Sequence, residues 1–433
     1  MNKKKITIIL MVFLAIFSTI MLVVNRDNVE ITNEVGNKSK KSNNLLTMNL
    51  EQTAGAGDYK TVTQSEWPTE GYKFNTELSR CENGSELSWD DTKKAVIVSG
   101  NLSDKCYVYF DIFIPKIPDI CNSGDTLADC IKQYGDKGSA ISNIYIHNSS
   151  LTNGAGDNSY RYAGTNPNNF VCFGSDASPC PTDNLYRIVG VFEDNYHGIT
   201  GKQLVKLIKY DYANSNLLGT GGDYKGSDTP NALYYKGSFT TINTYYWNNA
   251  GKNTWSESNL NKTNLNTNFI NNIGSTWANK IATTTWKVGG NTWANIGSKT
   301  PSVAYTNEIT NPDATNSNDN ATTYAAKIGL MYVSDYGFAA DPSAWTTTLQ
   351  DYDVSVNGAT IRSQNWMYMG YYEWTISRSA DLSSDAFIVY IYGRVGYSTM
   401  RSDRKGVRPS FNLESSVSYV SGSGSMSDPI AIN

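Results

Sequence analysis

The shortness of its apolar stretches constrains the fold of this chain more than any other feature. A clear example is residues 387–392 (FIVYIY), inside the aromatic and arginine-rich segment Asn365–Leu413. Such a run is too short for a core helix, and its β-branched and aromatic residues favour a strand. A polar, basic passage follows, and residues 407–413 resume an apolar pattern. We therefore expect a strand, an exposed loop over residues 390–405 and a second strand.

Similar short runs recur along the chain and predict a protein of the α+β class that is mostly β. Further strands are expected at residues 72–74, 96–98, 106–110, 185–192 and 204–208. One helix is expected within residues 117–133, where apolar residues fall at helical spacing. Another is expected after Trp255, where four apolar residues lie near one helical face: Leu260, Leu265, Phe269 and Ile273.

Tryptophan is concentrated in the second half of the chain. Eight of the ten tryptophans lie between Trp247 and Trp374. Large aromatic side chains build the core of loop-rich domains in which regular sheet is scarce, so we expect core residues here. The alternative is a platform on which sugar rings stack.

The N-terminus predicts export. Three lysines, Lys3 to Lys5, precede an uncharged run from Ile6 to Val24. As a helix, its nineteen residues span roughly 28 Å, enough to cross the core of a bilayer. Because lysines favour a cytoplasmic N-terminus, we expect a single-pass protein of the cell membrane with an extracellular C-terminal region. The alternative is a cleaved signal peptide and a secreted protein.

The cysteines agree with export, because disulfides persist outside the cytoplasm. The six cysteines form three local pairs, and proximity alone favours these pairings among the many that are open: Cys81–Cys106, Cys121–Cys130 and Cys172–Cys180. No CxxC motif occurs, and His147 and His197 are the only histidines. The residues therefore predict no metal site.

Shifts in composition divide the chain into five parts. Residues 1–24 are the transmembrane anchor or signal segment, and residues 25–51 are a flexible stalk rich in Asn, Lys and Ser. Residues 52–114 form a small disulfide-stapled β module. Residues 115–184 contain a helix and a Gly/Asn-rich connector, and residues 185–433 form a large loop-rich domain.

Several motifs carry a family resemblance: DNLYRIVGVF, TWSESNLNKTNLN, KIGLMYVSDYGFA and GVRPSFNLESSVSYVSGSGSMSDPI. They resemble the C-terminal domain of unknown function that is common in envelope proteins of gut Firmicutes and is related to the C-type-lectin-like fold. YKFNTELSRCENGSELSWDD resembles the small disulfide module that often precedes this domain. Sulfatase-modifying proteins share the broad fold and end near a G-[FV]-R motif, which residues 406–408 match. The resemblance covers roughly residues 70–433 and implies a C-type-lectin-like domain at residues 185–433.

The resemblance does not extend to enzyme activity. Formylglycine-generating enzymes of this fold need reactive cysteines in the domain to hold copper, but no cysteine follows Cys180. The triplets EPN and QPD of calcium-dependent lectins are absent, and residues 247–249 (WNN) only partly match the lectin triplet WND. Asp157 and Asn158 lack the rhythm of an EF-hand loop. We therefore expect no enzyme activity and no cofactor; calcium is compatible with the sequence but has no support in it.

Because of three acidic residues, a glycan hydrolase remains an alternative function. Glu373, Asp381 and Asp385 are close in sequence, and the paired carboxylates of glycoside hydrolases meet only in the fold. Ordinary solvated acids are the commoner case. The net charge of −4 does not favour a nucleic-acid partner.

The basic loop between the two expected strands is the best candidate for a ligand-binding site. It combines aromatic rings with guanidinium groups, which are enriched in binding hot spots, at Tyr390, Tyr392, Arg394, Tyr397, Arg401 and Arg404. In the C-type-lectin-like fold, the segment before the closing G-[FV]-R strand lies on the ligand-facing side. It also resembles the region that retroelements diversify in some bacterial surface proteins.

We therefore expect an adhesin-like, membrane-anchored protein of the cell surface that binds a protein or glycan through this loop. The alternatives are a surface glycan hydrolase, a structural envelope protein without a dedicated ligand, and an ordinary loop whose arginines pair internally.

Overall fold

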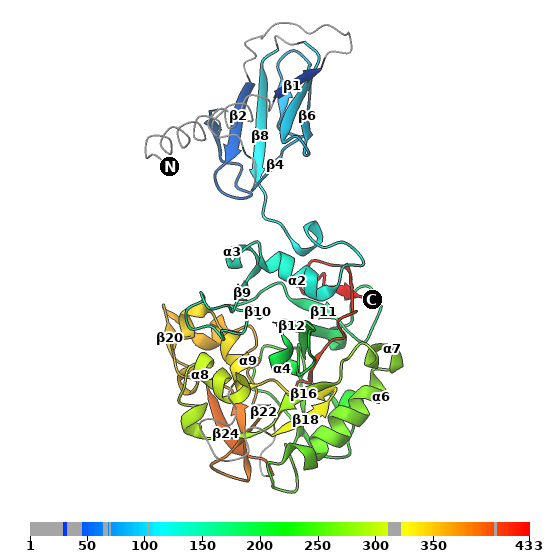
Figure 1. Ribbon diagram of the computed structural model, residues 1–433, viewed down its shortest axis with the longest axis vertical. Helices are drawn as coiled ribbons and strands as arrows, with labels where there is room; N and C mark the ends of the chain where they lie inside the picture. The colour runs from blue at the N-terminus through cyan, green and yellow to red at the C-terminus, as the bar shows by residue number, and fades with distance from the viewer. Residues whose placement is uncertain are drawn as a thin grey trace, which may run out of the picture. The chain divides into compact units, whose positions relative to one another are not determined.

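Figure 1 shows the computed structural model, which describes residues 29–32, 46–63, 68, 71–101, 104–310, 322–401 and 405–433. The chain forms two compact units, Met1–Pro115 and Lys116–Asn433. The described elements of the first unit are strands, and the second unit combines strands with short helices. The expected class, α+β and mostly β, is confirmed.

The first unit contains two small sheets that share one core. The larger sheet has the strand order β3-β2-β8-β4, with β5 also paired to β8, and the smaller has the order β1-β7-β6. The strands are β1 (Val29–Thr32), β2 (Leu46–Glu51), β3 (Tyr59–Val62), β4 (Tyr72–Phe74), β5 (Arg80–Cys81), β6 (Glu86–Asp90), β7 (Ala95–Ser99) and β8 (Cys106–Ile112). Side chains from both sheets meet in the core: Met48, Leu50, Phe74, Val96, Val98, Val108 and Phe110.

The strands of the first unit begin before residue 52. β2 lies within residues 25–51, which we expected to be a flexible stalk, and it pairs in parallel with β8 in the middle of the sheet. Leu46, Met48 and Leu50 alternate along β2, and Met48 and Leu50 are buried. This short alternation was missed because it follows directly on a stretch rich in Asn, Lys and Ser.

A seven-stranded sheet forms the frame of the second unit. Its order is β19-β25-β13-β12-β10-β9, with β11 also paired to β12, and its neighbouring strands are antiparallel. β12 and β13 confirm the strands expected at residues 185–192 and 204–208. The strands are β9 (Ile144–Ile146), β10 (Tyr160–Tyr162), β11 (Phe170–Cys172), β12 (Leu185–Phe192), β13 (Leu204–Lys209), β19 (Ile328–Gly329) and β25 (Ser410–Asn412).

A four-stranded sheet contains three strands of the aromatic and arginine-rich segment. Its order is β17-β22-β23-β24, with bounds β17 (Gly290–Asn291), β22 (Glu373–Ser379), β23 (Asp385–Val389) and β24 (Val395–Thr399). Two-stranded ladders complete the unit: β14 (Tyr224–Asp228) with β15 (Ile242–Tyr245), β16 (Thr284–Lys287) with β18 (Thr323–Ala326), β20 (Ser355–Val356) with β21 (Ala359–Thr360), and β26 (Tyr419–Ser421) with β27 (Ala431–Ile432).

Both expected helices are present in modified form. Within residues 117–133 the helix is α2 (Leu127–Gly135), and its cap is Thr126, whose hydroxyl accepts the N–H of Asp129. After Trp255, residues Leu260–Phe269 form a π-helix that continues into α6 (Ile270–Asn272). The five-residue apolar spacing there fits i→i+5 hydrogen bonds better than an α-helix. The other α-helices of the described residues are α3 (Ser139–Ser142), α4 (Asp194–His197), α5 (Ser215–Leu218), α7 (Ser275–Ala278), α8 (Pro301–Tyr305) and α9 (Val333–Phe338).

Residues 116–184 are an integral part of the second unit, although we expected a connector over residues 115–184. They supply α2, α3 and the strands β9, β10 and β11, and Figure 1 shows α2 and α3 above β9 and β10. The strands are only three residues long each and are separated by Gly/Asn-rich turns. From composition alone, this region is therefore predicted to be a loop.

The tryptophans build the core of the second unit, as expected. Those that are buried are Trp247, Trp255, Trp277, Trp286, Trp345, Trp366 and Trp374, whereas Trp293 is partly buried.

The three expected disulfides are present. Cys81–Cys106 joins directly opposed residues of β5 and β8. Cys121–Cys130 ties α2 to the turn before it, and Cys172–Cys180 closes the start of the loop between β11 and β12.

Among the residues described, no helix has both the length and the apolar character that a membrane span requires. The run from Ile6 to Val24, on which the expected anchor rests, lies outside the described residues.

Candidate functional site

The expected exposed loop at residues 390–405 is in large part a β-hairpin. β24 runs antiparallel to β23, and a tight turn joins the two strands. In this turn the N–H of Tyr390 donates to the carbonyl of Arg394 at 2.9 Å, and the N–H of Gly393 donates to the carbonyl of Tyr390 at 2.8 Å. The expectation of a loop is wrong over β24. Its buried residues include Gly396 and Ser398, which carry no apolar signal in the sequence.

Two of the expected binding residues, Tyr397 and Tyr390, lie on opposite faces of the hairpin. Tyr397 lies opposite Phe387, so the neighbouring Gly396 projects to the other face of the sheet. On the first face Tyr397 is 37% exposed, with its ring centre 5.4 Å from that of Trp293. On the second face Tyr390 covers Gly396, where an added Cβ would lie 2.2 Å from the Tyr390 ring.

Tyr390 and the described arginines Arg394 and Arg401 differ in their surroundings. The guanidinium of Arg394 lies 4.5 Å from the centre of the Tyr390 ring, which also contacts the ring of Tyr372. Arg401 is exposed and lies beside the backbone of Gly251. Arg404 lies outside the described residues. Tyr390 and Arg394 are thus brought together, and Arg401 is apart from them in the turn after β24.

Tyr392 lies in the hairpin turn and belongs to a second cluster. It is 41% exposed, and its ring centre is 5.1 Å from that of Tyr234. The guanidinium of Arg362 lies 5.1 Å from the centre of the same Tyr234 ring. Arg362 is also one of the residues that line a pocket, so the hairpin turn borders that pocket.

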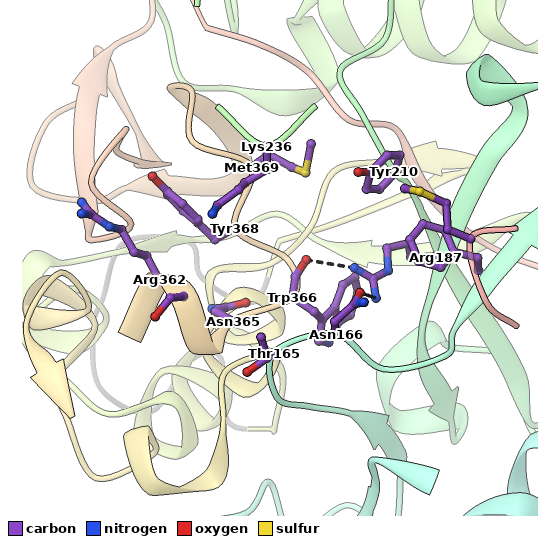
Figure 2. A pocket seen from close by; sticks show the side chains of 13 residues that line it. Thr165, Asn166, Arg187, Tyr210, Lys236, Arg362, Asn365, Trp366, Tyr368 and Met369 are labelled. Atoms are coloured by element: carbon purple, nitrogen blue, oxygen red, sulfur yellow. Dashed lines mark hydrogen bonds between the residues drawn. The ribbon is translucent and has the colours of Figure 1, made fainter. Parts of the chain in front are cut away.

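The pocket has a volume of about 310 Å³. Its lining combines basic, aromatic and small polar side chains with two methionines: Thr165, Asn166, Phe170, Arg187, Tyr210, Lys236, Arg362, Ser363, Asn365, Trp366, Tyr368, Met369 and Met426. Figure 2 shows Arg187 and Arg362 on opposite sides of it, with Asn365 and Tyr368 between them. The hydroxyl of Tyr368 donates to the carbonyl of Ile391 at 2.5 Å, which ties this wall to the hairpin turn.

Arg187 is a buried cation held between two aromatic rings. It projects from β12 directly opposite Phe170 of β11. Its guanidinium lies 4.3 Å from the centre of the Phe170 ring and 4.7 Å from that of Trp366. It donates to Asn169 Oδ1 at 2.6 Å, to the carbonyl of Pro167 at 2.9 Å and to the carbonyl of Trp366 at 3.3 Å. Every one of these acceptors is neutral.

Arg187 has no acidic partner among the described residues. Burial, assisted by the charge of the nearby Arg408, lowers its pKa to about 9, and only tyrosines oppose the shift. The carboxylates of the neighbourhood are engaged elsewhere. Glu373 accepts from Arg408 Nε at 2.7 Å, and Asp211 accepts from the Tyr235 hydroxyl at 2.7 Å. The pocket therefore contains a positive charge that the described part of the chain does not neutralise.

Arg408, the arginine of the G-[FV]-R motif, holds one wall of the pocket. It is buried, and its Nη2 donates to the carbonyl of Met367 at 2.6 Å. Gly370 follows in this wall with a φ of 80°, and a Cβ there would lie 1.9 Å from the carbonyl oxygen of Tyr234. Only glycine allows the chain at Tyr234 to approach so closely. The N–H of Lys236 then donates to the carbonyl of Met369 at 3.0 Å, which fixes Lys236 at the rim.

The three acids of the hydrolase alternative do not line this pocket. Glu373 is buried in the ion pair with Arg408; burial raises its pKa and Arg408 lowers it, with a net rise. Asp381 is exposed and accepts the N–H of Trp293 at 2.7 Å. Asp385 is buried and accepts from the hydroxyl of Ser384 at 2.9 Å.

The residues considered for calcium form internal contacts. Asp157 accepts from Arg161 Nη2 at 2.7 Å and from the hydroxyl of Tyr305 at 2.6 Å. Burial alone would raise the pKa of Asp157, but these partners lower it to about 2. Trp247 and Asn248 of the WNN triplet are buried and donate to backbone carbonyls. In the described ranges, no group of three or more Asp, Glu, His or Cys side chains is arranged to hold a metal ion.

Comparison with known proteins adds no relative: no family model matches the chain, and no curated protein or solved structure matches it significantly.

The loop predicted over residues 390–405 includes the hairpin turn, but the pocket beside it was missed. The pocket residues come from segments far apart in the chain, such as Arg187, Lys236 and Arg362, and no local motif links them. One signal was present. Arg187 interrupts the otherwise apolar strand Leu185–Phe192, which is buried along its whole length. A charged residue in such a strand has a specific partner or a specific role.

Proposed function

We propose that this chain is a membrane-anchored protein of the cell surface that binds an external ligand and does not alter it covalently. The observation that carries this proposal is the pocket that holds the unpaired cation Arg187 and is bordered by the exposed hairpin turn. Such a combination of a concave site, a few convergent polar groups and exposed aromatic residues is typical of ligand recognition. The ligand would contact the pocket and the cluster of Tyr392, Tyr234 and Arg362 at its rim.

Binding is favoured over hydrolysis by the chemistry of the lining. A glycoside hydrolase needs two carboxyl groups on either side of the scissile bond. The described lining of the pocket contains neither Asp nor Glu, and Glu373 is committed to Arg408. The catalytic pair that the hydrolase alternative requires is therefore missing from this pocket.

Location at the cell surface is the second part of the proposal. It is supported by the lysine-flanked apolar run Ile6–Val24 and by the three disulfides. Sequencing the N-terminus of the protein isolated from cells tests it. An intact N-terminus in the membrane fraction supports an anchor, whereas a mature chain that starts near Asn25 would replace the anchor with a signal peptide.

Membership of the Firmicutes envelope family, with a C-type-lectin-like second unit, is the third part. The buried Arg408 supports it, because this arginine links the segment before β25 to Glu373 of β22 and to the carbonyl of Met367, which gives the G-[FV]-R motif a structural role. The loop ahead of this motif also contributes the hairpin turn at the rim of the pocket.

Arrays of glycans and proteins, probed with the full chain in mild detergent, test the binding function. We expect retention on at least one ligand class, and we expect Tyr392→Ala to weaken it at least fivefold, in the range of a moderate hot spot. The matched control is Tyr107→Ala in the first unit, where a tyrosine also lies beside an arginine, Arg80. Absence of retention on every array, or equal losses in both variants, would contradict the proposal.

A further inference from the structure

The charges that face the pocket are all of one sign. Arg187 is 4% exposed, while Arg362 is partly buried and Lys236 is exposed at the rim. The lining includes no acidic residue among those described. Cationic side chains that converge without a counter-charge repel one another, and an anion in the cavity would relieve this repulsion.

Arg187 is prepared to receive such an anion. Its contacts with Asn169, Pro167 and Trp366 fix the guanidinium in the plane between the two rings. A guanidinium carries five N–H groups. Three of them donate to Asn169, Pro167 and Trp366, and Nη2 also makes a longer contact with Asn166 Oδ1 at 3.5 Å, so one N–H of Nη1 remains open. An anion that displaces the long contact with Asn166 can accept from both Nη1 and Nη2. A fixed guanidinium loses little entropy when it binds a planar acid, which it can meet with two parallel hydrogen bonds. Burial, together with the charge of Arg408, lowers the pKa of Arg187, and among the described residues no carboxylate offsets this effect.

The remaining lining favours a sugar as the carrier of the acidic group. The hydroxyl of Thr165 and the amide of Asn166 are exposed at the rim and suit the hydroxyl groups of a sugar. Tyr210 and Tyr368 supply aromatic surface for its apolar ring face. The volume of about 310 Å³ is at the low end of ligand pockets, which fits one ring of a larger chain. A peptide with a free C-terminal carboxylate is the competing ligand, but such carboxylates are typically captured by backbone N–H groups, and the lining of this pocket is made of side chains.

We propose, on the basis of the binding function above, that the pocket binds the anionic group of an acidic sugar residue, a carboxylate or a sulfate, with Arg187 as its counter-charge. Arg362 and Lys236 attract the acidic chain from the rim, and the hairpin turn with Tyr392 contacts the residues that extend beyond the pocket. No bond is made or broken.

Calorimetric titration of the full chain in mild detergent tests this assignment. The central pair of probes is a tetramer of galacturonic acid and its fully methyl-esterified form, which have the same shape and differ in charge. We expect the acid to bind at least tenfold more tightly than the ester, and we expect its affinity to fall with added salt. A sulfated tetrasaccharide in a further arm shows which of the two anionic groups is preferred.

Variants of the cations identify the site. Arg187→Gln should weaken the binding of the acid about 30-fold or more and leave the binding of the ester unchanged, since it removes a buried counter-charge. Arg187→Lys keeps the charge but loses the planar fork, so an intermediate loss is expected. Arg362→Gln and Lys236→Gln should each weaken it about threefold, and the control Lys137→Gln, an exposed lysine on the turn after α2, should have no effect. If Arg187→Gln does not fold, the two rim variants carry the test, because their side chains are at the surface.

The outcomes separate this inference from the function on which it rests. Equal affinity for acid and ester, or binding of the acid that is unaffected by the Arg187 and rim variants, would overturn the anion site while array binding leaves the recognition function intact. Stronger binding of an acetylated tripeptide with a free carboxylate would overturn the assignment to a sugar. Failure to bind any probe, together with empty arrays, would overturn both.

Discussion

At the scale of single residues, the buried charges determine which parts of the molecule are fixed and which are open to a ligand. Glu373 and Arg408 neutralise each other in the core. Asp157, Asp335, Arg161 and Lys206 form a second buried network. Arg187 is the exception among these buried ions, because its partners in the described structure are carbonyl and amide oxygens. For this reason we assign a structural role to the Glu373–Arg408 pair and to the network around Asp157, and a role in recognition to Arg187.

Replacement of Glu373 by Gln tests whether this residue is structural. The change leaves the buried Arg408 without its counter-charge, and we expect a loss of about 3 kcal/mol or more in the free energy of unfolding, measured with urea. The double variant Glu373→Gln/Arg408→Met should lose less than the sum of the single variants. A loss below about 0.5 kcal/mol, of the size seen at neutral surface sites, would show that the ion pair does not hold the pocket wall.

The Asp157 network predicts acid sensitivity. The pKa of Asp157 in the folded chain is about 2, below the ordinary value of 3.8. Its contribution to stability is therefore complete above about pH 4 and is lost as the pH falls toward the folded pKa. His147 acts in the same direction, because burial, followed by the charge of Arg161, holds its pKa well below 6.5. Urea unfolding between pH 5 and pH 2 should show a decline that is smaller by about 2 kcal/mol in Asp157→Asn. Parallel curves for the two proteins would contradict this account of the network.

At the scale of elements, the sequence predicted strands well where their residues are apolar and poorly where glycine or polar residues fill the buried positions. The strands β12 and β13 were predicted correctly because at least half of the residues in each are apolar. β24 was missed because Gly396 contributes no apolar side chain to the pattern. Its buried position is covered by the ring of Tyr390, which lies in the turn before the strand. The π-helix at Leu260–Phe269 shows the same limit, since the spacing indicated a helix and only the hydrogen bonds define its type.

Gly396→Ala tests the packing of the hairpin. The new methyl group would lie where the Tyr390 ring now rests, so the ring and the adjoining turn must move. We expect a loss of about 1–3 kcal/mol in unfolding free energy, as in other overpacked sites. The control Thr399→Ala changes an exposed residue of the same strand and should stay within about 0.5 kcal/mol. A variant as stable as the parent protein would mean that Tyr390 is not held against the strand.

At the scale of the whole molecule, composition identified the class of fold and the local disulfides but not the pocket. The division into two units after Pro115 follows a change that is visible in the sequence, whereas β2 and the strands of residues 144–172 were hidden by polar neighbours. The pocket could not be predicted because tertiary folding alone brings Arg187, Lys236 and Arg362 together. Tertiary folding also separates residues that were expected in one site: Tyr392 borders the pocket, and Tyr397 lies on the face with Trp293.

Hydrogen exchange of the full chain, with and without its array ligand, tests most directly whether recognition takes place at the pocket and the hairpin turn. We predict slower exchange at residues 362–369 and 390–394, which form the wall of the pocket and the turn beside it, and unchanged exchange in the strands of the first unit. Protection confined to Trp293 and residues 397–401, or protection in the first unit alone, would contradict the account and move the binding site to another surface.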